Sequence, residues 1–406
     1  NNNNFVEKLE TNEAKIEKIK LSQRMLVGIN KRIWETFKNE QKQNWTNLEC
    51  NRFINGDENY IKEKAKNKIK YLDPKEELLL MDCNSIKSRN YFLEKPISEI
   101  ENKFPLAYAR NDYRFLEAEL ATNYHPQNWY CYAIDSKANP LFRKRMHALA
   151  NCFPNIIIPS KELSVDSAGH STGSAFMSCL NELVDPKNRW EYVFTLQNHD
   201  TQIKTNEEIV QIFKWLDGAN SIEFEFRHVG PQRMIKEMHQ KHSWTFDNLH
   251  LFKNELNLTK MLAQLDTRNY GADELFFQTI GSSDHLNAPN GFTHKCVEQK
   301  IDVPYIIRYS VWDYGPGRWE NVGKCHSHNM RHYICMLGIE DLAPTVTKIK
   351  HLFVNKMMPS TDFGAIYCWH EEMRRRTLTR FHQEWLKTNG NVDLQKFNCS
   401  EPTVPT

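Results

Sequence analysis

The feature that most constrains this sequence is a regular alternation of short apolar runs with amphipathic stretches. The apolar runs lie at residues 129–134, 155–158 and 192–196. The amphipathic stretches that follow them lie at residues 141–149, 174–183 and 206–216. The last of these stretches is preceded by Thr205, a favourable helix cap. Strand–helix alternation at this interval predicts an α/β fold with a parallel sheet.

Ligands of such sheets bind beyond the carboxyl ends of the strands. Asp135 follows the first apolar run, a loop follows Ile158, and residues 198–200 follow the third run. We therefore expect the functional site to lie near these three segments.

The whole chain has 406 residues, 53 basic against 51 acidic side chains, and 40% hydrophobic residues. A chain of this length can bury a large core, and its net charge of +2 argues against a dedicated nucleic-acid binder. Residues 1–48 read as a solvated helix or stalk, because apolar side chains recur at helical spacing among Lys and Glu. Residues 49–388 form the main domain, and residues 389–406 a short tail.

Cysteine usage points to an oxidising compartment. The ten cysteines contain no repeated C-x-x-C pair, and three N-glycosylation sequons begin at Asn44, Asn257 and Asn398. Both features are compatible with a secretory route.

Two local patterns have competing interpretations. Residues 169–173 fit the G-x-S-x-G of serine hydrolases around Ser171, but residues 163–168 make a poor strand, which favours a loop entering a capped helix. A cluster of Cys and His side chains suggests zinc, yet its spacing matches no standard site and a disulfide is simpler. The cluster comprises Cys325, His326, His328, His332 and Cys335.

The chain has no D-x-D, the carboxylate pair with which many glycosyltransferases hold a metal-bound diphosphate; the nearest substitute is the Glu223–Phe–Glu225 pattern. A bound diphosphate would therefore need Arg or Lys, and Arg331 and Lys356 are candidates. Asp273 and Glu274 precede an apolar helix, where acidic residues serve as caps or, among apolar neighbours, as a general base.

In their order along the chain, these pieces resemble the core-2/I-branching β-1,6-N-acetylglucosaminyltransferases, glycosyltransferase family 14, and most closely their nematode-type members. The resemblance extends over about residues 50–377. Its motifs lie at residues 50–57, 104–108, 126–128, 130–131, 134–137, 151–155, 203–210, 273–274, 338–342, 351–356 and Cys368.

The resemblance implies a GT-A-like fold with a mixed central sheet flanked by helices and an N-terminal helical stem. It implies transfer of GlcNAc from UDP-GlcNAc to the 6-hydroxyl of a glycan, with inversion and without a metal. Glu274 would be the catalytic base. The donor would contact Asp135, Arg331 (or the adjacent His332) and Lys356, and the acceptor would contact Glu225, Trp312 and Tyr314.

The resemblance also implies disulfides Cys50–Cys368, Cys83–Cys152, Cys131–Cys179 and Cys325–Cys335, which leave Cys296 and Cys399 free. The expected protein is a type II membrane glycoprotein of the Golgi lumen, with its membrane anchor outside this chain. A homodimer is the candidate assembly. Alternatives are a relative that uses UDP-xylose, or one that binds UDP-sugar or glycan without turnover.

Overall fold

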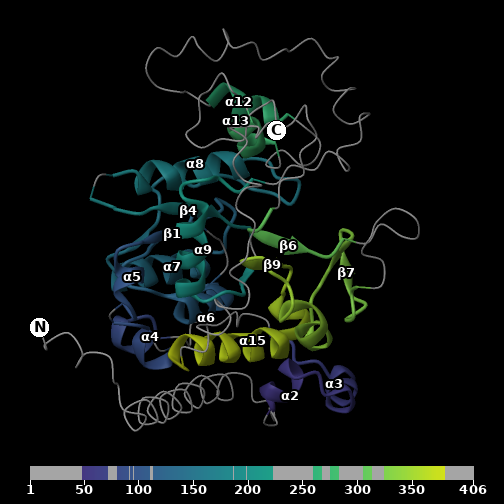
Figure 1. Ribbon diagram of the computed structural model, residues 1–406. Coiled ribbons are helices and arrows are strands. Elements are labelled where there is room, and N and C mark those ends of the chain that lie inside the picture. The colour runs from purple at the N-terminus through teal and green to yellow at the C-terminus, as the bar shows by residue number, and fades with distance from the viewer. Residues whose placement is uncertain are drawn as a thin grey trace, which may run out of the picture.

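The structure is a computed structural model that describes residues 48–71, 80–90, 92–94, 96–109, 113–185, 187–197, 199–222, 259–267, 275–282, 305–312 and 324–379. The predicted tail and all of the predicted stem except Leu48 lie outside these ranges. Figure 1 shows a larger and a smaller sheet surrounded by helices.

The larger sheet confirms the predicted alternation. Its four strands are all parallel and run in the order β3-β2-β1-β4. They are β1 (Leu106–Ala109), β2 (Trp129–Cys131), β3 (Ile156–Ile157) and β4 (Tyr192–Thr195). The helices between and after them are α6 (Tyr113–Asn123), α7 (Pro140–Cys152), α8 (Thr172–Leu183) and α9 (Asn206–Leu216). Thr205 caps α9 in a reciprocal capping box with Glu208, as its position predicted.

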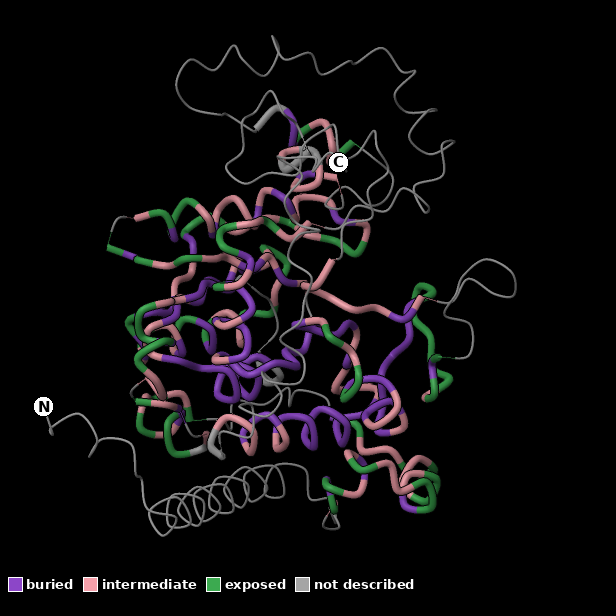
Figure 2. Tube along the Cα trace, in the orientation of Figure 1, coloured by how far each residue is buried: buried purple, intermediate pink, exposed green. Residues whose placement is uncertain are grey.

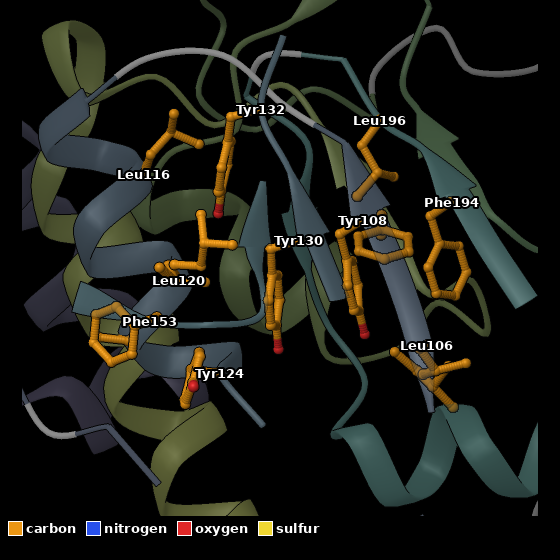
Figure 3. Close-up of a cluster of buried hydrophobic side chains, with 14 of the residues drawn as sticks. Leu106, Tyr108, Leu116, Leu120, Tyr124, Tyr130, Tyr132, Phe153, Phe194 and Leu196 are labelled. Carbon is orange, nitrogen blue, oxygen red and sulfur yellow. The ribbon is translucent and has the colours of Figure 1, made fainter. Parts of the chain in front are cut away.

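Successive side chains of a strand point to opposite faces, so β1 contributes side chains to two separate cores. Leu106 and Tyr108 pack in the core that also holds residues of α6, α7 and α9, and the Tyr108 ring stacks on Tyr130 at 5.2 Å between centroids. Figure 3 shows these rings side by side. Ala107 faces the opposite core, where the Cys131–Cys179 disulfide joins β2 to α8. Helices therefore cover both faces of the parallel sheet.

The smaller sheet contains the mixed pairing that the sequence analysis placed in one central sheet. Its order is β5-β9-β6, with β5 (Thr201–Gln202) antiparallel and β6 (Arg308–Ser310) parallel to the central β9 (Phe353–Asn355). A hairpin of β7 (Met330–Arg331) and β8 (Ile334–Cys335) lies beyond it. The ring of Phe353 meets that of Phe194 at 5.2 Å, so β9 and the parallel sheet share a core.

The long helix α15 (Pro359–Thr379) runs across the lower part of the molecule in the view of Figure 1, above α2 (Cys50–Ile54) and α3 (Glu58–Ala65). Figure 2 shows that much of its length is buried, whereas α3 is largely exposed or half-buried. Trp369 of α15 is 1% exposed and donates its indole N–H to the Gln202 carbonyl oxygen at 2.9 Å. The remaining described elements are α2 (Cys50–Ile54), α3 (Glu58–Ala65), α4 (Cys83–Arg89), α5 (Glu99–Asn102), α12 (Thr259–Leu265), α13 (Phe276–Ser282), η3 (Ile339–Asp341) and η4 (Leu342–Val346).

All four predicted disulfides are confirmed. Cys50–Cys368 joins α2 to α15, Cys83–Cys152 joins α4 to α7, Cys131–Cys179 joins β2 to α8, and Cys325–Cys335 joins the loop before β7 to β8. The remaining two cysteines, Cys296 and Cys399, lie outside the described residues. None of the helices in the described part of the chain combines the length and apolar character needed to cross a membrane.

Candidate functional site

The candidate site lies where β9 ends. Lys356 follows Asn355, the last residue of β9. The backbone N–H of Lys356 donates to the Cys335 carbonyl oxygen at 3.5 Å, and its carbonyl oxygen accepts from the Leu337 N–H at 2.9 Å. Lys356 is therefore held beside the β7–β8 hairpin. Lys356 is half-buried.

Positive charge gathers around this lysine. Burial lowers the pKa of Lys356 below that of an ordinary lysine, and the nearby cations Arg331 and Arg308 lower it further, while Asp200 acts in the opposite direction. Arg331 comes from β7 and Arg308 from β6. Two arginines from separate parts of the sequence thus lie near enough to Lys356 to act on its charge, an arrangement that suits an anion with several charges.

One buried carboxylate lies among these cations. The side chain of Asp200 is 0% exposed, and its Oδ1 accepts a hydrogen bond from Asn355 Nδ2 at 2.7 Å. Its Oδ2 accepts from the Gln197 N–H at 2.8 Å and lies 3.4 Å from Arg308 Nη1. Both oxygens are therefore committed to fixed partners.

The hairpin that carries Arg331 has a two-residue turn and is held by a disulfide. Arg331 is exposed, and its Nη1 lies 3.4 Å from Met358 Sδ. His332 and Tyr333 form the two-residue turn with φ of 50° and 63°, the left-handed region that Asn and Gly usually occupy in such turns. The Cys325–Cys335 disulfide ties the base of the hairpin to the preceding loop. Trp312 forms an isolated antiparallel bridge with Ile334, so it lies alongside β8.

Asp135 belongs to the other sheet. It lies beyond the carboxyl end of β2, where it bridges to Leu163, and its Oδ1 accepts from the Lys137 N–H at 2.9 Å. This is the position at which the alternation predicted a ligand contact. The structure thus brings Arg331 and Lys356 together, with His332 and Trp312 on or beside the same hairpin, and places Asp135 on the edge of the parallel sheet.

The remaining site predictions lie outside the described residues. They concern Glu274, Glu225 and Tyr314, and the sequons at Asn44, Asn257 and Asn398. The helix expected after Glu274 is present as α13, which begins at Phe276. Phe276 is 0% exposed and packs with Met261 and Leu262 of α12. The segment that follows Glu274 is therefore anchored in a small apolar core.

Sequence comparison assigns the chain to a family. The profile of the core-2/I-branching enzyme family matches residues 104–264 and 245–346, which together span more than half of the chain. The chain belongs to the core-2/I-branching enzyme family.

Curated relatives agree with this assignment. A mouse protein named beta-1,3-galactosyl-O-glycosyl-glycoprotein beta-1,6-N-acetylglucosaminyltransferase 3 is 26% identical over 82% of this chain and 84% of its own length. A human beta-1,3-galactosyl-O-glycosyl-glycoprotein beta-1,6-N-acetylglucosaminyltransferase is 25% identical over 82% of this chain and 86% of its own length. A bovine herpesvirus 4 protein of the same name is 26% identical over 73% of this chain and 74% of its own length. The branching-enzyme chain is thus a glycosyltransferase-type enzyme, with the α/β architecture expected of a GT-A-like fold.

The zinc site and the serine-hydrolase elbow are not supported by the structure of this branching enzyme. Cys325 and Cys335 are joined in a disulfide, so they are not thiolate ligands and the zinc hypothesis is wrong. Ser171 is the cap residue of α8, which agrees with a loop entering a helix, but its side chain makes no cap hydrogen bond. Its N–H instead donates to Asp266 Oδ1 at 2.9 Å. No strand runs into Gly169, so the hydrolase elbow lacks the strand that the motif requires.

Arg308 and Asp200 were not among the site residues expected from the sequence. Asp200 fell inside the predicted ligand-facing segment 198–200, which was the available signal. Arg308 stands in a three-residue strand, too short to show a periodic pattern.

Proposed function

We propose that this branching enzyme transfers GlcNAc from UDP-GlcNAc to the 6-hydroxyl of an O-glycan acceptor, with inversion at the anomeric carbon. The names of its relatives, which specify a β-1,6 linkage and a galactosyl-O-glycosyl acceptor, support the reaction class. The observation that carries the proposal in this chain is Lys356 at the end of β9, with Arg331 and Arg308 near enough to lower its pKa.

Lys356 and Arg331 would bind the diphosphate of the donor. As the bond between sugar and phosphate breaks, negative charge grows on the departing UDP, and cations held in a partly dry site stabilise that charge. A divalent metal does the same work in other transferases, and two or three protein cations would take its place here, so we propose that transfer does not require a metal. His332, next to Arg331 on the hairpin turn, would contact the same group.

Glu274 would accept the proton of the acceptor hydroxyl while that oxygen attacks the anomeric carbon from the face opposite UDP. The new glycosidic bond forms as the bond to phosphate breaks, which inverts the anomeric configuration. Asp135, at the edge of the parallel sheet, would contact the nucleoside. Trp312 lies beside β8 and, with Tyr314 and Glu225, would line the acceptor side.

We further propose a Golgi-lumen location with a type II membrane anchor outside this chain, N-glycans at Asn44, Asn257 and Asn398, and a homodimeric assembly. The four disulfides support passage through an oxidising compartment.

The decisive assay combines the purified protein, UDP-GlcNAc and a panel of O-glycan cores in excess EDTA, with mass spectrometry of the acceptors. A gain of one N-acetylhexosamine in EDTA is expected, and the substituted core names the acceptor. The same panel with UDP-xylose tests the alternative donor. UDP binding without mass gain on either donor would instead favour the non-catalytic relative. A Glu274→Gln variant that retained wild-type transfer would contradict the base assignment.

A further inference from the structure

We propose that Asp200 is a positioning residue for Lys356, which it orients and partly neutralises through contacts at the end of β9. The inference deepens the proposed function and rests on it, because the role of Lys356 at the diphosphate belongs to that proposal.

The short segment before β5 holds both neighbours of Lys356. On one side, Asp200 Oδ1 accepts from the side chain of Asn355 at 2.7 Å. On the other side, the His199 carbonyl accepts from the Met357 N–H at 3.2 Å. Because the residues before and after Lys356 are both fixed to residues 199–200, the direction in which the lysine side chain leaves the backbone is fixed as well.

The charge of Asp200 acts in the same place. Lys356 faces Arg331 from β7, Arg308 from β6 and Asp200 from the segment before β5. Arg331 and Arg308 repel the ammonium of Lys356, whereas Asp200 attracts it. The Asp200 carboxylate is 0% exposed, so water screens its field little. It therefore compensates part of the repulsion among the cations before an anion arrives.

Asp200 differs from the buried carboxylate Glu208 in what it faces. Glu208 is also fully buried, but its partner is Arg376 of α15 and its neighbour Lys204 donates to the Ile349 carbonyl at 3.0 Å. That cluster fastens α9 to α15 and includes none of the three cations of the candidate site. Glu208 thus offers a matched control: a buried, paired carboxylate with a purely structural setting.

The experiment measures the titration of Lys356 directly. Trace acetylation with acetic anhydride across pH 7 to 11, with peptide mass spectrometry, gives the labelling midpoint of each lysine. Asp200→Asn should move the Lys356 midpoint down by about one pH unit, because it removes a negative charge that favours the ammonium. Arg308→Gln should move it up, because it removes a like charge. Glu208→Gln should leave it in place, although it lowers the melting temperature.

UDP titration calorimetry runs on the same proteins. Asp200→Asn should weaken UDP binding more at pH 9 than at pH 6.5, because Lys356 of this variant loses its proton at a lower pH. An unchanged Lys356 midpoint in Asp200→Asn, or a downward shift in Arg308→Gln, overturns the inference. If Asp200→Asn fails to fold, Asn355→Ala decides: it removes the hydrogen bond to Asp200 Oδ1 beside Lys356, and an unchanged Lys356 midpoint in this variant overturns the inference. If the wild-type protein binds no UDP, the proposed function fails, while the labelling midpoints still decide whether Asp200 controls Lys356.

Discussion

His370 Nε2 lies 2.7 Å from Glu119 Oε2 in the interior between α15 and α6, where the two side chains are only 5% and 4% exposed. The other Glu119 oxygen accepts from Asn123 Nδ2 at 3.0 Å and from the Gln202 N–H at 3.1 Å. One carboxylate therefore connects α6, β5 and α15.

Replacing Glu119 by Ala should destabilise the protein by roughly 3–5 kcal/mol, because the buried imidazole and the Gln202 N–H lose their acceptor together. Urea unfolding measures the change. Glu58→Ala is the control, since the Glu58–Lys62 pair is 80% and 72% exposed, and it should change the free energy of unfolding by less than about 1 kcal/mol. Equal losses in the two variants would show that the buried connection contributes little.

Lys356→Ala and Arg331→Ala should each weaken UDP binding about 10- to 100-fold, the loss expected when a charge-assisted hydrogen bond disappears. Lys187→Ala, which removes an exposed lysine paired with Asp185, should bind UDP as the wild type does. Isothermal titration calorimetry gives the comparison. Retained affinity in both site variants would move the diphosphate away from the end of β9.

The pH dependence of UDP binding has a defined sign. Burial and the cation Arg331 lower the pKa of Lys356, so the ammonium loses its proton at a lower pH than a free lysine does. Wild-type affinity for UDP should therefore hold near neutral pH and decline as the pH rises through this lowered pKa. Lys356→Ala should show no such decline. An affinity that is constant up to about pH 10, near the ordinary lysine value, would contradict the assignment.

The Cys325–Cys335 and Cys50–Cys368 disulfides should have separable effects. Chain-entropy arguments give the larger stabilisation to the longer loop, and the sequence separations are 10 and 318 residues. Cys50→Ala with Cys368→Ala should lower the melting temperature more, and Cys325→Ala with Cys335→Ala should reduce UDP affinity more, because it frees the hairpin that carries Arg331. Calorimetry of unfolding and of UDP binding tests both halves, and a reversed order of the two effects would refute them.

His125 should contribute to acid sensitivity. Burial lowers its pKa to about 3, so this imidazole stays neutral in the folded protein while it is protonated below its ordinary value of 6.5 in the unfolded chain. The unfolded state then binds more protons, and stability falls as the pH drops from 6.5 toward 3, by up to about 1.4 kcal/mol per pH unit. In His125→Gln the slope of unfolding free energy against pH should be smaller by about one proton. An unchanged slope would assign the acid sensitivity to other groups.

The parallel half of the fold could be predicted because its signal is local. Each strand in residues 129–196 is followed by its own amphipathic helix, and Thr205 marks the start of α9. The β5-β9-β6 sheet gave no such signal, since its strands have two or three residues and join segments far apart in the chain.

Part of the candidate site could likewise be predicted from the sequence, and part could not. Residue type and family resemblance selected Arg331 and Lys356, and the resemblance supplied the four disulfide pairs. The link between Asp200 and Asn355 spans 155 positions, and that between Asp200 and Arg308 spans 108. Neither can be inferred from spacing, because only the packing of β5, β9 and β6 brings these side chains together.

The Cys50–Cys368 bond closes residues 50–368 into a covalent ring that begins in α2 and ends in α15. During synthesis this ring stays open until Cys368 has been made, 318 residues after Cys50. Completion of the native structure is therefore a late event that depends on the oxidation of one thiol near each end of the domain. A single cut of the backbone anywhere between the two cysteines would leave both pieces in one molecule.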